Sequence, residues 1–252
     1  RKGQQTMCDN LETIGYLYNG GFAEYMKVPE NAVLNGCVNK LPENLSFEEA
    51  AIAEPLACVI NGQILSMIEI GDTVVVIGAG PIGCFHSQLA RINGAAKVIL
   101  GDISSERLEM AEFTGAKLVD MSKENIKEIV KEETEGKMAD RVIVAAGSKE
   151  AQETAVEIVA KRGSVNFFGG LPKEAPFINL NSNLVHYGEF FITGTHGSSP
   201  LHNKIAISLL SNKAIDGKNY ITHKFPLEEI KQALKTAEDK KGLKVIIKME
   251  DY

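Results

Sequence analysis

A run of apolar residues leads directly into a glycine-rich turn within the first third of the chain. Residues 72–83 read DTVVVIGAGPIG, and Asp102 follows nineteen residues after the last glycine. Gly78 allows the tight turn, Gly80 lets a pyrophosphate approach the backbone, and Gly83 lets the next helix pack closely on the strand. A lone G-x-G-x-x-G pattern is weak, but strand, turn, helix, second strand and terminal acid in this order predict a dinucleotide-binding βαβ unit.

The helix after this turn has apolar residues at three- to four-residue spacing and Gly94 as its expected end. Its first N–H groups and its dipole favour a phosphate. The second strand carries Asp102 to its carboxyl end, where a carboxylate accepts hydrogen bonds from ribose hydroxyls and repels a 2′-phosphate. We therefore expect NAD rather than NADP. The alternative is that the glycines serve only as structural turns.

From residue 72 onward, apolar strands alternate with segments of helical periodicity. Such alternation specifies a parallel sheet whose two faces are both covered by helices. We therefore predict an α/β fold with a doubly wound parallel sheet. The predicted strands cover residues 73–77, 97–101, 117–120, 141–146, 164–168 and 189–194, and the predicted helices cover 82–93, 105–114, 124–134 and 149–161.

Two later strands also end in glycine, one at Ala146 and Gly147 and the other at Gly169 and Gly170. The carboxyl ends of the strands line the ligand crevice of a doubly wound sheet, so we expect these residues near the cofactor. Glycine is common after strands, and a purely structural role for both turns is the alternative.

The segments on either side of the alternating region follow a different rhythm. Residues 22–28 read as a strand closed by Pro29, and residues 46–49 form a capping box that opens a helix. Pro55 ends that helix and begins another, which leaves the carboxylate of Glu54 at the break. The predicted elements after residue 195 are helices over 200–212 and 226–239 and a strand over 244–248, which return to the first domain.

Composition and charge exclude several classes of protein. The net charge of −6 and the dispersed Lys and Arg residues argue against a nucleic-acid-binding protein. No apolar run approaches the length of a membrane span, and the first residues do not open a signal peptide. The four cysteines form no C-x-x-C pair and, on their own, read as reduced thiols. We therefore expect a soluble, cytoplasmic protein with neither nucleic acid nor membrane as a partner.

Four segments together resemble the medium-chain, zinc-dependent alcohol dehydrogenases, closest to their sorbitol and threonine dehydrogenase branch. They are GGFAEY at 20–25, EPL at 54–56, GAGPIG at 78–83 and ITHKFPL at 221–227. The resemblance implies a Rossmann domain over 55–195, and a mostly β, GroES-like catalytic domain that contributes 1–54 and the return segment 196–252. The residues that match the cofactor site are Gly78, Gly80, Pro81, Ile82, Gly83, Asp102, Arg107, Ala146, Gly147, Phe168, Gly169, Gly170, Thr195 and His196. For Arg107 the alternative is a surface ion pair with Glu106 or Glu109.

The same resemblance implies two zinc sites, and this chain carries one residue of each. The stretch from Arg1 to Cys8 matches the last spacer and fourth cysteine of the family's structural motif, C-x-x-C-x-x-C-x7-C. Glu54 matches the glutamate that approaches the catalytic zinc, although by its residue type alone it reads as a solvated or helix-terminal carboxylate. The other ligands and the catalytic residues belong before residue 1. We therefore expect an N-terminally incomplete chain without bound zinc and with negligible activity.

The resemblance implies that the complete protein oxidises a secondary alcohol, with zinc polarising the substrate oxygen and NAD accepting the hydride. The candidate substrates are a polyol, a sugar alcohol, a sugar phosphate and a hydroxy amino acid. Sorbitol dehydrogenases have an Arg-Tyr pair after the last cofactor-domain strand, whereas this chain has Gly197 and Ser198, which weakens the case for a polyol. The apolar edge strand around Ile192 and the resemblance both predict a homodimer or homotetramer.

Two other interpretations stay open. The first is a non-catalytic NAD-binding fragment or pseudoenzyme. The second is a zinc-free quinone reductase of the same superfamily, against which Cys8 and the Glu54–Pro55 pair argue.

Overall fold

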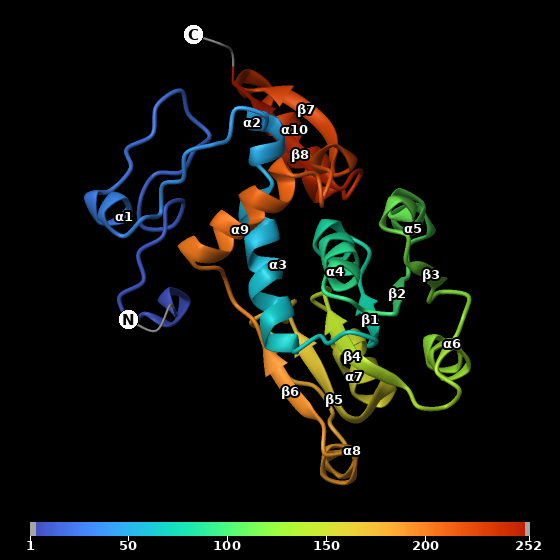
Figure 1. Ribbon diagram of the computed structural model, residues 1–252. Coiled ribbons are helices and arrows are strands. Elements are labelled where there is room, and N and C mark those ends of the chain that lie inside the picture. The colour runs from blue at the N-terminus through green and yellow to red at the C-terminus, as the bar shows by residue number, and fades with distance from the viewer. Residues whose placement is uncertain (1–3, 250–252) are drawn as a thin grey trace. The chain divides into compact units, whose positions relative to one another are not determined.

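A computed structural model describes residues 4–249 (Figure 1). Arg1, Lys2 and Gly3, which begin the predicted zinc spacer, lie outside the described residues. The chain forms two compact units, one from Cys58 to His196 and the other from the segments that precede and follow it. The boundaries expected after residues 54 and 195 lie within three residues of these limits. No helix between residues 4 and 249 combines the length and apolar character that a membrane span requires.

The larger unit is the predicted doubly wound parallel sheet. Its spatial order is β3-β2-β1-β4-β5-β6, and every neighbouring pair is parallel. The chain runs outward from β1 to β3 and then returns to the other side of β1. At such a switch point, the carboxyl ends of the strands diverge and leave a crevice for a ligand. The strands are β1 (Thr73–Ile77), β2 (Lys97–Asp102), β3 (Lys117–Asp120), β4 (Ala139–Val144), β5 (Val159–Phe167) and β6 (Phe191–Gly194).

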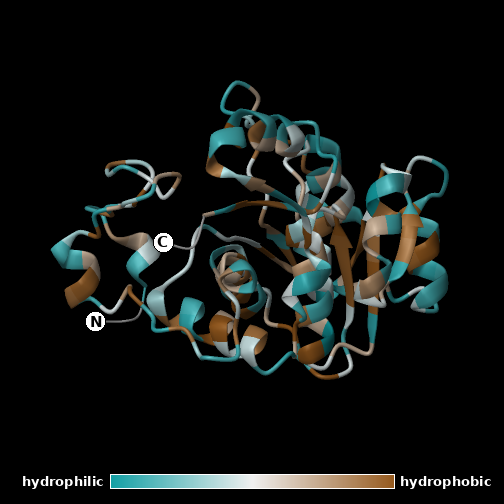
Figure 2. Ribbon diagram, turned by 90° about the horizontal axis from the view of Figure 1, so that it is seen from above, coloured by the Kyte–Doolittle hydropathy of each residue, from teal (hydrophilic) through white to brown (hydrophobic). Residues whose placement is uncertain are grey.

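Both faces of this sheet are buried. In β1, Val74, Val75 and Val76 have no exposed surface, which explains why the strand is a continuous apolar run rather than an alternating one. Figure 2 shows hydrophobic strands enclosed by helices that carry hydrophilic residues. The helices are α3 (Ala53–Ser66), which leads into the unit, α4 (Pro81–Ile92), α5 (Ser105–Met110), α6 (Ile126–Glu133), α7 (Lys149–Ile158) and α8 (Ser182–Gly188).

The structure corrects the predicted boundary between α7 and β5. The helix was expected to continue to residue 161, but Val159 is extended and pairs with Ala139 of β4. Val159 and Ala160 fit a helical face and a strand equally well, and the pairing with β4 decides between them. The predicted helix 105–114 also divides, because Ala111 leaves the α conformation and a 3-10 turn follows over Glu112–Thr114.

The second unit contains a single two-stranded parallel sheet among the residues described, β7 (Ile221–Pro226) with β8 (Lys244–Lys248). The strand predicted over 22–28 is wrong, because that segment is irregular and no strand of the described chain pairs with it. A strand needs a hydrogen-bonded neighbour. The resemblance implied a mostly β domain, but the described part of this unit is not mostly β. Its helices are α1 (Glu30–Leu34), α2 (Phe47–Ala50), α9 (Pro200–Ser211) and α10 (Ile230–Glu238), with 3-10 turns at Gln5–Met7, Gly217–Asn219 and Leu227–Glu229.

Candidate functional site

The glycine turn between β1 and α4 has the geometry that its residues predict. Gly78 has φ +110°, a conformation that L side chains rarely adopt. A Cβ at Gly83 would lie 1.7 Å from the carbonyl oxygen of Gly78, so α4 packs too closely on β1 for any side chain there. At Gly80 the nearest atoms belong to the guanidinium of Arg107, 3.6 Å from the position of a Cβ. A Cβ at Gly80 would therefore touch only the guanidinium of Arg107, the end of a flexible side chain. Apart from Gly80 and its two chain neighbours, no backbone atom among the described residues lies within 4 Å of that position.

The first turn of α4 lies at the carboxyl edge of the sheet. Pro81 is its first residue, no side chain caps it, and Ile82 follows in the same turn. Proline suits this position because it has no N–H to leave unpaired. The other N–H groups of a first turn have no partner within the helix, and the helix dipole adds positive potential. This turn has the chemistry that binds a pyrophosphate.

Two backbone N–H groups hold the Asp102 carboxylate. Ala79 donates to Oδ2 at 2.6 Å, and Ser104 donates to Oδ1 at 2.9 Å. Asp102 is 8% exposed, and no salt bridge within the described part of the chain includes it. Each carboxylate oxygen accepts more than one hydrogen bond. Asp102 can therefore bind a ribose diol without losing either backbone contact.

Arg107 lies over the glycine turn. Besides the approach of its guanidinium to Gly80, its backbone N–H donates to Ser104 Oγ at 3.3 Å. Within residues 4–249 no salt bridge joins Arg107 to Glu106 or Glu109, the partners in the alternative interpretation. The geometry thus supports the interpretation that places this cation beside the cofactor turn.

The turns after β4 and β5 approach each other closely through glycine. A Cβ at Gly169 would lie 2.6 Å from the carbonyl of Ala146, and a Cβ at Gly147 would lie 2.8 Å from the carbonyl oxygen of Gly170. The side-chain amide of Gln152 donates to the carbonyl of Gly169 at 3.0 Å. This packing accounts for the glycines by itself, as the structural alternative holds. Both turns nevertheless lie at the edge of the sheet where the cofactor is expected.

Phe168, just before these glycines, packs on a buried histidine that the sequence analysis did not place in the site. The rings of Phe168 and His86 meet edge to face, with their centroids 4.7 Å apart. A Cβ at Gly62 of α3 would lie 2.9 to 3.0 Å from both rings, so only glycine fits there. Gln63 Nε2 donates to the carbonyl of His86 and contacts its Nδ1, both at 3.1 Å. Burial lowers the pKa of His86 to about 3, and its Nε2 has no hydrogen-bond partner among the residues that the structure describes.

A buried polar network holds Thr195 beside the end of β5. Asn166 Nδ2 donates to Ser66 Oγ at 2.9 Å and to the carbonyl of Gly62 at 3.0 Å, and the hydroxyl of Thr195 donates to Asn166 Oδ1 at 3.1 Å. The sequence patterns did not indicate this network, because its contacts join residues 29 and 100 positions apart. The structure thus brings Thr195 to the carboxyl edge, and it leaves the side chain of His196 exposed.

The two residues that match zinc ligands do not form a metal site. Cys8 is exposed, and Glu54 is exposed in the first turn of α3. Between residues 4 and 249, no group of three or more His, Cys, Asp or Glu side chains is placed to hold a metal ion. A protein zinc site takes at least three such ligands. The residues described therefore do not fit a zinc ion.

The sequence is similar to several dehydrogenases. Residues 81–212 match the family described as zinc-binding dehydrogenase. D-arabitol-phosphate dehydrogenase of Enterococcus avium is 31% identical over 250 residues, which cover 98% of this chain and 69% of the relative. Sorbitol dehydrogenase of Halalkalibacterium halodurans is 28% identical, with 97% and 70% covered. L-threonine 3-dehydrogenase of Caldanaerobacter subterraneus is 33% identical, with 93% and 66% covered. This chain thus spans about two thirds of the length of these relatives.

Solved structures with either cofactor are similar as well. A zinc-binding dehydrogenase from Sinorhizobium meliloti 1021 bound to NADP is 30% identical, with a TM-score of 0.84, and the match covers 92% of this chain and 67% of that one. A short chain alcohol dehydrogenase from Escherichia coli CFT073 complexed with NADH is 26% identical, also with a TM-score of 0.84, and the match covers 94% and 67%.

Proposed function

The chain belongs to the zinc-binding dehydrogenase family, and we propose that it forms the cofactor-binding part of an oxidoreductase that transfers a hydride from a secondary alcohol to NAD. The observation that carries this proposal is the Asp102 carboxylate, which two backbone N–H groups hold beside the glycine turn. The names of the relatives support the substrate class. They specify a sugar-alcohol phosphate, a polyol and a hydroxy amino acid, each of which carries a secondary hydroxyl.

The residues present fit a dinucleotide. The glycine backbone at Gly80 and the guanidinium of Arg107 beside it suit a pyrophosphate, and the carboxylate of Asp102 suits the ribose hydroxyls. Gly169 and Thr195 lie at the carboxyl ends of β5 and β6, where the nicotinamide is expected. NAD supplies the hydride acceptor when it is bound. The part of this chain is to bind NAD and to orient its nicotinamide.

NAD is proposed rather than NADP because a 2′-phosphate would lie beside the negative charge of Asp102. Similar structures contain NADP or NADH, so similarity alone does not choose between them. The proposal rests on the carboxylate. A buried negative charge without a cationic partner opposes a second negative charge more strongly than a neutralised one does.

The second candidate function is that of a protein that binds NAD without catalysing a reaction. The observation that favours it is the separation of the metal-matching residues, because Cys8 and Glu54 belong to no group of three possible ligands among the described residues. Under this interpretation the chain binds the cofactor but does not polarise an alcohol.

Three measurements on the same preparation test both candidates. They are the fluorescence of NADH during titration, the zinc content, and NADH formation from NAD with sorbitol, D-arabitol phosphate or L-threonine. We expect NADH binding without stoichiometric zinc or turnover by this chain alone. Turnover would exclude the non-catalytic candidate, stoichiometric zinc would overturn the ligand count, and absence of NADH binding would overturn the cofactor role.

A further inference from the structure

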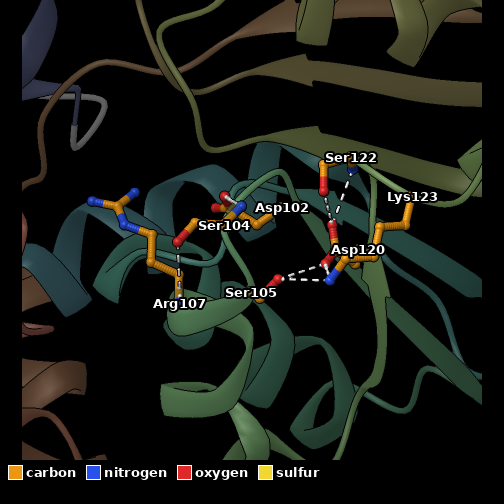
Figure 3. Close-up of polar contacts among 7 residues, drawn as sticks. All are labelled: Asp102, Ser104, Ser105, Arg107, Asp120, Ser122 and Lys123. Carbon is orange, nitrogen blue, oxygen red and sulfur yellow. Dashed lines mark hydrogen bonds and ion pairs between the residues drawn. The ribbon is translucent and has the colours of Figure 1, made fainter.

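We propose that Asp120 is a second residue that selects NAD over NADP, and that it acts by holding Lys123 and Ser105 away from the 2′ position of the adenosine ribose. The inference rests on the proposed function, which assigns Asp102 to that ribose, and it extends the selectivity to the neighbouring strand (Figure 3).

Asp102 and Asp120 are neighbours at the carboxyl edge of the sheet. They are the last residues of β2 and β3, and they are register partners in this parallel pair. Register partners in adjacent parallel strands point to the same face of a sheet. Figure 3 shows the polar groups around the two aspartates, with Ser105, the first residue of α5, between them and Ser104 on the side of Asp102 towards Arg107. A group held by Asp120 is therefore close to the proposed ribose site.

The carboxylate of Asp120 is fully occupied. Its Oδ2 accepts from Lys123 Nζ at 2.7 Å and from Ser105 Oγ at 2.6 Å. Its Oδ1 accepts from the backbone N–H of Ser122 at 3.1 Å and from Ser122 Oγ at 2.5 Å. The hydrogen bond from Lys123 is the main cause that keeps the pKa of Asp120 well below its usual range, and Asp120 in turn raises the pKa of Lys123. Both groups are charged at neutral pH.

The two carboxylates therefore differ in what they offer a cofactor. Asp102 keeps acceptor capacity for a ribose diol, because within residues 4–249 two backbone N–H groups are the donors to its carboxylate. The carboxylate of Asp120 accepts four hydrogen bonds and has no further acceptor site for a cofactor. It instead holds one ammonium group and one hydroxyl group, which are the kinds of group that bind a phosphate.

Lys123 lies close to the segment that follows Asp102, where the adenosine ribose is expected. Its Nζ lies 3.0 Å from Ser105 Oγ, and the preceding residue, Ser104, holds Asp102 through its backbone N–H. While Asp120 is charged, it keeps the ammonium group of Lys123 in an ion pair. Asp102 thus repels a 2′-phosphate directly, and Asp120 withholds the cation that would bind it.

The side chain of Asp120 can be neutralised without opening its turn. The backbone N–H groups of Lys123 and Glu124 donate to the carbonyl of Asp120 at 2.9 and 2.8 Å, and these bonds do not depend on the carboxylate. Asp120→Asn therefore removes the charge and keeps the shape. Asp120→Ser serves as a second variant with the same expectation.

The experiment measures dissociation constants for NADH and NADPH by fluorescence titration at one fixed ionic strength. We expect Asp120→Asn to leave NADH affinity within about threefold and to tighten NADPH about tenfold, the effect of one freed charge-assisted contact. Asp102→Ser alone weakens NADH and improves NADPH only slightly. In the double variant with Asp102→Ser and Asp120→Asn, the increase in NADPH affinity is larger than the product of the increases in the two single variants. Adding Lys123→Met to the double variant removes this excess. Glu157→Gln is the control, since Glu157 pairs with Lys127 on a different surface.

The outcomes separate the two proposals. If the unmodified chain prefers NADH but the NADPH-to-NADH ratio is unchanged in both Asp120 variants, Asp120 only stabilises its turn and the inference is wrong. The inference is also wrong if the increase in NADPH affinity persists after Lys123→Met is added. If the unmodified chain prefers NADPH or binds neither nucleotide, the assignment of Asp102 fails and the inference fails with it.

Discussion

At the scale of single residues, Asp102 differs from Asp72 and Asp120 because backbone N–H groups hold its carboxylate and no salt bridge among the described residues includes it. Asp72 pairs with Arg141 at 2.8 Å, and Asp120 pairs with Lys123 at 2.7 Å. A carboxylate in a salt bridge must give up its cation before it can bind a ligand. Asp102 has no such salt bridge among the described residues, and its two backbone contacts already fix its orientation, so it can accept ribose hydroxyls without rearrangement.

Asp102→Ser should weaken NADH binding by roughly 10- to 100-fold, because hydrogen bonds to a charged acceptor contribute about 1.5–3 kcal/mol. A fluorescence titration measures the change, with Glu157→Gln as a control for the loss of one surface carboxylate. Unchanged NADH affinity in Asp102→Ser would contradict the assignment of this residue to the ribose.

His86 gives a pH-dependent prediction. Its pKa is about 3 in the folded chain and 6.5 as the reference value, so between these values only the unfolded chain takes up this proton. The stability contributed by neutral His86 is therefore present above pH 6.5 and is lost as the pH falls towards 3. The slope from this group is about 1.4 kcal/mol per pH unit. His86→Leu should lose unfolding free energy less steeply than wild type in urea denaturation across this range. Equal slopes would show that His86 is not buried as a neutral ring.

At the scale of elements, α3, α4 and the end of β5 are joined by close packing at Gly62. This glycine leaves no space for a Cβ between the rings of His86 and Phe168. The polar network of Asn166 joins the same helix to β5 and to Thr195. The position of Phe168, and with it the turn at Gly169, therefore depends on how α3 packs on the sheet.

Gly62→Ala should destabilise the chain by about 1–3 kcal/mol, because the added methyl group overfills a packed core and displaces one of the two rings. Thermal unfolding measures the effect. Gly194→Ala is the matched control, since the nearest atom to its Cβ would be 3.8 Å away. A Gly62→Ala variant as stable as the control would mean that this contact is looser than described.

The elements that the sequence predicts well are those with a signal of their own. The strands at 73–77 and 117–120 have the predicted bounds, and α4 begins at Pro81 beside its glycine turn. The end of α7 and the segment 22–28 are decided by strand pairing, which local periodicity does not contain. Local periodicity does not predict the Asn166 network either, because its contact with Ser66 joins residues 100 positions apart. The glycine turn and Asp102 are readable because they are nearly contiguous.

At the scale of the whole molecule, the two edges of the six-stranded sheet differ. The β3 edge is protected by charge, since Lys117 pairs with Glu133 at 2.5 Å. The β6 edge presents Phe191, which is 59% exposed, and Ile192, which is partly exposed. An apolar, unpaired edge strand favours pairing with a second chain. We therefore predict a dimer through β6, with Ile192 near the centre of the interface.

Light scattering of wild type and Ile192→Lys tests the predicted dimer. A lysine at the centre of an apolar interface places a charge where no counter-charge is expected, so the variant should be monomeric at concentrations where wild type is dimeric. Leu118→Lys, on the opposite edge strand, is the matched control and should leave the mass unchanged. A monomeric wild type, or an Ile192→Lys variant that associates as tightly as wild type, would remove the basis for this interface.

We propose that Asp102 gives this chain its preference for NAD. The ratio of the dissociation constants of NADPH and NADH for the unmodified chain, measured in one buffer by fluorescence titration, tests this proposal. We expect NADH to bind at least about tenfold more tightly, because the 2′-phosphate would meet the ordered carboxylate of Asp102. Equal affinities, or tighter binding of NADPH, would contradict it.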